Sequence, residues 1–218
     1  MGIPVLVIGK SGSGKSRSLK GFEKDEIALI NVESKPLPFK GKFEAVRNTD
    51  DYGKINALFD KTTKNSIVVD DAGYLITNQF MRGHSSAGKG NGVFALYNDL
   101  GDSFWSLIQH AKALPDDKIV YFIMHEDESD SGSIKPKTIG KLLDEKVCIE
   151  GMFTIVIRCM KREGKHFFKT STDGLDVTKT PEDMFESEEI DNDLKMVDTA
   201  IREYWGLSPL KTQNKGDK

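Results

Sequence analysis

Cysteine is scarce in this sequence of 218 residues, where Cys148 and Cys159 are the only two. Their spacing suits neither a zinc site nor a disulfide framework, so we expect reduced thiols in a cytoplasmic protein. Long apolar runs are also missing, and no basic segment followed by an apolar core opens the chain. The sequence therefore predicts neither a membrane-spanning helix nor a signal peptide.

Net charge is small as well, at −3. The chain as a whole thus lacks the basic character that would indicate nucleic-acid binding, although a local basic patch can still form. The histidines His84, His110 and His166 do not cluster with His125, so we predict no zinc site. The length is sufficient for one domain with a hydrophobic core of its own, or for one domain with a small appendage.

Five apolar, β-branched segments stand out along the chain. Each is nearly continuous, which is typical of strands buried on both faces of a sheet. They span residues 3–9, 26–33, 66–71, 118–125 and 152–160. Apolar residues three and four apart predict a helix over 93–113, and Glu163-Gly164 predicts a hairpin turn. We expect an α/β fold with a mostly parallel central sheet flanked by helices, a C-terminal β-hairpin and a short helix.

Four segments do not fit the strand and helix patterns. Residues 82–92 and 126–140 are rich in glycine or serine and too long for ordinary connections, so we expect functional or disordered loops. The acidic segment 182–193 is expected to be a solvated linker, or alternatively a mimic of nucleic acid that competes for basic loops or binds a partner. After a short amphipathic helix with Leu194, Val197, Ile201 and Tyr204 on one face, residues 211–218 are expected to fray.

The stretch GKSGSGKS directly follows the first predicted strand and matches the pattern G-x-x-x-x-G-K-[ST]. Backbone N–H groups of such a loop wrap a phosphate, and a helix starting near Lys15 would direct its own N–H groups at the same anion. We expect Lys15 to neutralise the β- and γ-phosphates and Ser16 to bind Mg²⁺. A flexible turn without function is the alternative. The predicted nucleotide-binding residues are Gly9, Lys10, Ser11, Gly12, Ser13, Gly14, Lys15, Ser16 and Arg17.

Asp70 ends the buried segment SIVVD and is the expected second ligand of the Mg²⁺ ion. The alternative is an ordinary aspartate that caps a helix, a role that Asp71 is expected to have for the segment that follows. Glu33 ends another strand at the same edge of the sheet, where it would face the γ-phosphate. His125 ends a third strand and could hydrogen-bond the γ-phosphate. A solvated Glu33 and a His125 bonded to backbone are the alternatives.

The order of these motifs resembles the ATPase core of RecA-type recombinases. It is more closely similar to the compact phage RecA-like single-strand annealing proteins of the Sak-four group, which are often labelled phage nucleotide-binding or AAA-type proteins. The resemblance covers about residues 1–175 and leaves 176–218 as acidic linker, short helix and tail. It implies ATP and Mg²⁺ as cofactors, Glu33 as catalytic glutamate and His125 as γ-phosphate sensor, where the family usually has glutamine.

The resemblance also implies a set of DNA contacts. Segments 82–92 and 126–140 match the two DNA-binding loops of the family, which are mobile without DNA and which ATP orders through the sensor strand. Lys89 in the first, with Lys135 and Lys137 in the second, would contact phosphates. Lys169 lies near where the family inserts lysines into the ATP site of a neighbouring subunit. Nearby candidates for that role are Arg158, Lys161, Arg162 and Lys165.

The function implied is a cytoplasmic, Mg²⁺-dependent ATP hydrolase that binds single-stranded DNA and promotes annealing or strand exchange in phage recombination. We expect a ring or filament with ATP between subunits. This assembly would form without the N-terminal segment that polymerises larger recombinases. A single-strand binding protein is considered as a partner. A nucleotide or small-molecule kinase is an alternative, but its arginine-rich lid is missing, since 126–140 has no arginine and 82–92 only Arg82. An ATP-switched, non-enzymatic binding module is the third reading.

Overall fold

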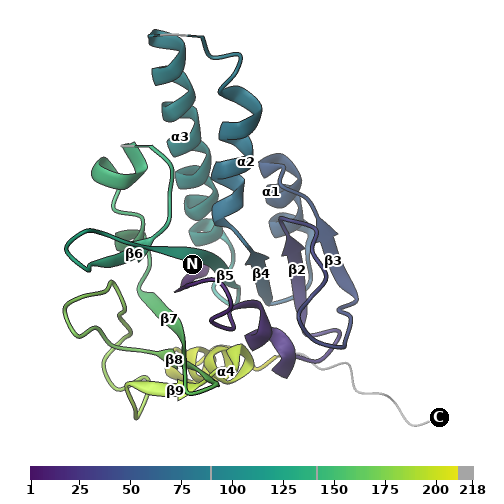
Figure 1. The fold of residues 1–218 in the computed structure, drawn as a ribbon. Helices are drawn as coiled ribbons and strands as arrows, with labels where there is room; N and C mark the ends of the chain where they lie inside the picture. The colour runs from purple at the N-terminus through teal and green to yellow at the C-terminus, as the bar shows by residue number, and fades with distance from the viewer. Residues whose placement is uncertain (89, 141, 211–218) are drawn as a thin grey trace.

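The computed structural model describes residues 1–88, 90–140 and 142–210. One sheet runs through it in the order β3-β2-β4-β5-β1-β7-β8-β9, with β6 paired to β5 (Figure 1). Its parallel strands are β1 (Ile3–Gly9), β2 (Ile27–Asn31), β3 (Ala45–Asn48), β4 (Ser66–Asp70), β5 (Ile119–Glu128) and β7 (Ile155–Arg162). The predicted α/β fold with a mostly parallel sheet is thus confirmed.

Three short strands pair antiparallel with this parallel sheet. They are β6 (Ile134–Pro136), β8 (Lys165–Lys169) and β9 (Glu189–Asp191). The predicted hairpin joins β7 to β8, and its two turn residues have positive φ, 51° at Glu163 and 81° at Gly164. Positive φ at both central positions is the requirement of the tight turn that matches strand twist, which is why Gly164 suits it.

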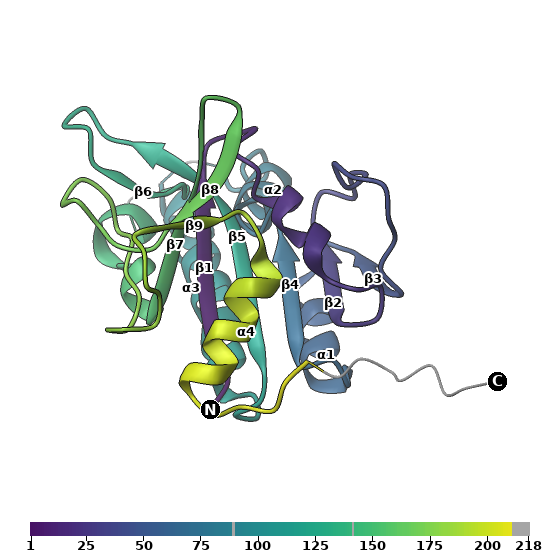
Figure 2. The same ribbon diagram turned by 90° about the horizontal axis from the view of Figure 1, so that it is seen from below.

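Helices cover both faces of the sheet and bury two separate apolar clusters. One face carries α1 (Tyr52–Lys61), α2 (Gly73–Gly83) and α3 (Asn91–Ala113), whereas the 3₁₀ helix Ser16–Gly21 and α4 (Leu194–Tyr204) lie on the other (Figure 2). Alternate residues of β1 supply the two clusters, with Leu6 and Ile8 in the first and Val5 and Val7 in the second. A π-helix at Leu142–Lys146 and a 3₁₀ turn at Glu150–Met152 complete the helical elements of the described chain.

Helix α4 is fixed to the sheet by a buried polar network. Asp198 is fully buried, and its carboxylate accepts hydrogen bonds from Ser66 Oγ at 2.6 Å, Tyr121 Oη at 2.9 Å and Arg202 Nε at 2.6 Å. The expected apolar face is buried at Leu194, Val197 and Ile201, whereas Tyr204 stays 44% exposed. Both oxygens of the buried carboxylate therefore accept a hydrogen bond, as burial of a charge requires.

The acidic segment 182–193 is not merely a solvated linker, because β9 lies within it and pairs with β8. The two long segments that were expected to be loops also contain more regular secondary structure than expected. Residues 82–88 and 90–92 lie at the tip where α2 turns into α3, and much of 126–140 forms the hairpin of β5 and β6 (Figure 1). Of the helices in the described residues, none has the length and apolarity needed to cross a membrane.

Candidate functional site

The stretch Gly9–Ser16, here called the phosphate loop, leaves the sheet at its carboxyl edge. Strand β5 lies between β1 and β4, so that Gly9 is in register with His125, and Asp70 ends the strand beyond. The predicted helix after the loop is wrong in type: Ser16–Gly21 is a single short 3₁₀ helix. Because so short a helix has a weak dipole, the loop amides and Lys15 must provide most of the attraction for an anion.

Two glycines of the phosphate loop are explained by what surrounds them. Gly14 has a φ of 108°, and a Cβ there would lie 2.6 Å from Nδ1 of His166. At Gly9 a Cβ would lie 2.6 Å from the carbonyl oxygen of Cys159. Both neighbours belong to the β7–β8 hairpin, so this hairpin and the loop fit together only with glycine at these positions.

Lys15 is a buried cation held by carbonyl groups. Its side chain donates to the carbonyl oxygens of Gly9 at 2.8 Å and Lys10 at 3.0 Å, and its Nζ lies 3.5 Å from Nδ1 of His125. Only 6% of the residue is exposed, and this burial lowers the pKa of Lys15. Within the described part of the chain no carboxylate forms an ion pair with it. A buried charge with only neutral partners is suited to receive an anion such as a phosphate group.

Ser16 and Asp70 are brought together as the sequence suggests. The Ser16 hydroxyl donates to Oδ1 of Asp70 at 2.9 Å, and burial together with the nearby charge of Asp71 raises the pKa of Asp70 to about 6. A hydroxyl and a carboxylate are oxygen ligands of the kind that Mg²⁺ takes. The described residues contain no cluster of three metal-ligating side chains, so a bound Mg²⁺ would need phosphate oxygens and water as its other ligands.

Asp71 does not cap α2, which corrects the expectation for this residue. The N-cap of α2 is Ala72, and the Asp71 carboxylate instead forms an ion pair with Lys35 at 3.1 Å. It also lies 3.7 Å from Nε2 of His125, whose pKa is lowered by burial and by the charge of Lys15. Asp71 has a φ of 60°, a left-handed conformation that aspartate tolerates better than most residues.

A cavity of about 380 Å³ opens over the phosphate loop. Its wall includes Ser11, Gly12 and residues 14–17 of the loop region, together with Lys35, Asp71, His125, Lys161 and His166. We call it the phosphate cavity. Sequence reasoning did not assign Lys35 or His166 to it, because their proximity depends on a loop after β2 and on how the hairpin folds back over the phosphate loop.

Glu33 is not part of the wall of the phosphate cavity. Its Oε1 accepts a hydrogen bond from Nδ2 of Asn78 on α2 at 3.0 Å, and the same nitrogen lies 3.0 Å from Oδ2 of Asp50. Asp50 in turn pairs with Arg82, at the start of segment 82–92. No sequence pattern indicates a role for Asn78, which lies between Thr77 and Gln79 on α2.

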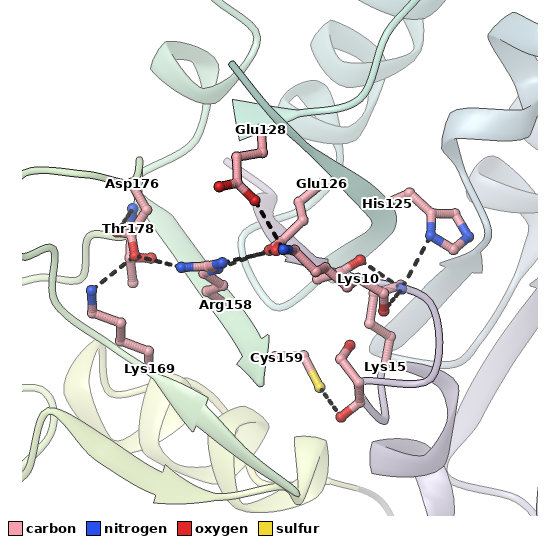
Figure 3. Close-up of polar contacts among 12 residues, drawn as sticks. Lys10, Lys15, His125, Glu126, Glu128, Arg158, Cys159, Lys169, Asp176 and Thr178 are labelled. Carbon is pink, nitrogen blue, oxygen red and sulfur yellow. Dashed lines mark hydrogen bonds and ion pairs between the residues drawn. The ribbon is translucent and has the colours of Figure 1, made fainter. Parts of the chain in front are cut away.

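A chain of ion pairs connects the phosphate loop with the hairpins beside it (Figure 3). Lys10 contacts Glu128 at 2.9 Å, Arg158 donates two hydrogen bonds of 2.8 Å to Glu126, and Lys169 contacts Asp176 at 2.8 Å. The structure therefore directs Lys10 and Lys169 toward carboxylates and does not bring either into the wall of the phosphate cavity.

The lysines expected to contact DNA are placed in different ways. The backbone N–H of Lys137 donates to the carbonyl oxygen of His125 at 2.8 Å, so the segment 126–140 is tied to the predicted sensor residue. Lys135 lies on β6, paired with Asp127 of β5. Lys89 lies outside the described residues.

Comparison with known proteins places most of the chain in one family. A family model described as an AAA domain matches residues 1–182, a range that contains the phosphate loop, Glu33, Asp70 and His125. No curated protein matches the chain.

Proposed function

The chain belongs to the AAA domain family, and on that premise we propose that it is a Mg²⁺-dependent ATPase that binds single-stranded DNA and promotes annealing or strand exchange. The proposal includes the resemblance to phage proteins of the Sak-four type, a cytoplasmic location and self-association into a ring or filament. It is carried by one observation: Lys15, which is buried and has no carboxylate partner among the described residues, lies beside the Ser16–Asp70 pair on a phosphate loop.

Each residue at the carboxyl edge would have a separate task in ATP hydrolysis. Loop amides and Lys15 hold the phosphates, and Ser16 and Asp70 hold the Mg²⁺ ion, which would withdraw charge from the phosphates when bound. Glu33 would orient or deprotonate the attacking water, which requires its carboxylate to leave Asn78 or the water to reach it there. His125 would hydrogen-bond the γ-phosphate through a ring nitrogen.

The environment of segment 126–140 supports the DNA-binding part of the proposal. Its acidic residues would repel a polyanion, but two of them are already neutralised within the chain. Glu126 pairs with Arg158 and Glu128 with Lys10. Lys137 remains exposed and is joined through its backbone to His125. A movement of His125 on nucleotide binding would therefore be transmitted to segment 126–140 through the hydrogen bond between its carbonyl oxygen and the N–H of Lys137.

The proposal is tested by phosphate release with and without single-stranded DNA. We expect DNA to raise the turnover of the wild-type protein, and we expect DNA affinity to fall as salt rises. Glu33→Gln should bind ATP like the wild type but lose turnover by about 100-fold or more, because an amide cannot accept the proton of water. Glu44→Gln, at an exposed ion pair with Lys24, is the matched control. Wild-type turnover in Glu33→Gln would show that the base is misassigned.

A further inference from the structure

Two residues of the β7–β8 hairpin face the phosphate loop of their own chain. Lys161 on β7 and His166 on β8 are directly opposite each other in the antiparallel register. Side chains of such a pair lie on the same face of the two strands. Both residues line the phosphate cavity, and Figure 2 shows the hairpin turn beside the loop that follows β1.

His166 is fixed on the phosphate loop by a hydrogen bond. Its Nδ1 lies 2.5 Å from the carbonyl oxygen of Ser13. Because a carbonyl can only accept, Nδ1 must carry the proton and donate. Nε2 is left for another partner, and because a phosphate oxygen can also only accept, Nε2 donates to it in the imidazolium form, in which both ring nitrogens carry protons. A Cβ on Gly14, the loop residue that precedes Lys15, would lie 2.6 Å from Nδ1 of His166.

Lys161 differs from four other cations near the phosphate loop. Lys10, Arg158, Arg162 and Lys169 each form an ion pair with a carboxylate. Lys161 is exposed, and none of the ion pairs found among the described residues includes it. Its ammonium group is therefore available to an anion in the cavity without first breaking an internal contact.

The charge balance of the cavity favours a highly charged anion. Its wall has the cations Lys15, Arg17, Lys35 and Lys161, whereas Asp71 is the carboxylate that lines it. Lys35 is already paired with Asp71, and the guanidinium of Arg17 donates to the amide oxygen of Asn192 at 3.1 Å. An excess of positive charge thus remains at Lys15, Arg17 and Lys161, because the amide of Asn192 is neutral.

We infer that Lys161 and His166 are further nucleotide-binding residues, which contact the phosphates of ATP held by the phosphate loop of the same chain. The inference rests on the proposed ATP site and assigns the hairpin to it. It differs from what the resemblance implies, where hairpin lysines reach the site of a neighbouring subunit. In this chain the hairpin already lies on its own loop, held there by the His166–Ser13 hydrogen bond.

The first test measures the affinity for a fluorescent ATP analogue by anisotropy in the presence of Mg²⁺. Lys161→Ala should weaken binding about tenfold, the loss expected for one charge-assisted hydrogen bond to phosphate. Lys161→Arg should restore most of it. Lys54→Ala is the matched control, because Lys54 is an exposed lysine on α1 that does not line the phosphate cavity. Equal affinities of Lys161→Ala, Lys54→Ala and the wild type would overturn the inference.

A second test separates contacts within one chain from contacts between chains. Lys15→Ala chains have an intact hairpin but a defective loop, and Lys161→Ala chains have the reverse. If the hairpin serves its own chain, an equimolar mixture should show only the weak sites of Lys161→Ala. Recovery of wild-type affinity in part of the sites would show that the hairpin acts on a neighbouring chain instead.

The two proposals fail in different ways. Absence of ATP binding by the wild-type protein would overturn the ATPase assignment and the hairpin contact together. Binding by the wild type that depends on Lys15 but not on Lys161 would leave the ATPase assignment in place and overturn the hairpin contact alone. His166→Asn, checked by thermal melting for a folded state, should likewise weaken binding, since its amide cannot span from Ser13 to a phosphate.

Discussion

The hydroxyl of Ser16 donates a hydrogen bond of 2.9 Å to Oδ1 of Asp70, joining residues that are 54 positions apart in the chain. One follows β1 directly after the phosphate loop, and the other ends β4. The two groups that would hold Mg²⁺ are thus already adjacent. Ser16 and Asp70 would together hold the ion when it is bound, as oxygen ligands of the kind that Mg²⁺ takes.

We predict that Ser16 and Asp70 act as a unit in Mg²⁺-dependent ATP binding. Ser16→Ala and Asp70→Asn should each weaken Mg²⁺-dependent binding by about tenfold or more, and the double variant should lose less than the sum of the two free energies. A double-mutant cycle on ATP affinity with and without Mg²⁺ measures this. Thr199→Ala, at an exposed position on α4, is the control. Additive losses would show that the two residues act independently.

We also predict a pH dependence of stability that comes from Asp70. Its pKa is raised from 3.8 to about 6 by burial, so the folded state favours the protonated form. Ionisation of Asp70 therefore lowers the free energy of unfolding. This loss is absent below about pH 4, grows as pH rises and reaches its full size above about pH 6. It amounts to about 3 kcal/mol at most, at 1.36 kcal/mol per pKa unit.

This dependence is measured by urea unfolding of wild type and Asp70→Asn without Mg²⁺ or nucleotide. The free energy of unfolding of the variant, relative to the wild type, should rise between pH 4 and pH 7, because the amide never ionises. A constant difference between the two proteins over that interval would contradict the prediction.

The two cysteines should differ in reactivity. Cys159 is buried, its thiol donates to the carbonyl oxygen of Ser13 at 3.2 Å, and burial raises its pKa to about 11. Cys148 is exposed. We expect iodoacetamide at pH 8 to modify the native protein once, at Cys148, and both cysteines after unfolding. Intact mass and peptide mapping detect this, with Cys148→Ser as control. Rapid modification of Cys159 would show that β7 does not pack on the phosphate loop as described.

The central fold was predictable because its strands are buried on both faces. Runs such as residues 3–9 and 67–69 are apolar without interruption, and Glu163-Gly164 has the residue preference of a tight turn. Strand β3 was missed because it lies at an edge, with Arg47 and Asn48 exposed, so half of its four residues are polar. Strand β9 was missed for a similar reason, since its two acids are exposed.

The site was predictable where one local motif determines it and not where distant elements meet. The phosphate loop and the strand-ending Asp70 follow from their positions after buried strands. The contact of Asn78 with Glu33 depends on how α2 packs. The contact of His166 with Ser13 depends on the direction in which the hairpin folds back. Neither of these two contacts is indicated by a sequence pattern in the residues around it.

The most direct test of the account is isothermal titration calorimetry of ATP with Mg²⁺ into the wild-type protein and into Lys15→Ala. Because Lys15 is a buried cation without an ion-pair partner in the described residues, we predict a clear binding heat for the wild type. We predict a loss of affinity of at least about 100-fold in Lys15→Ala, since the phosphates would face a pocket without its buried charge. No binding heat with the wild type, or equal affinity in the two proteins, would contradict the account.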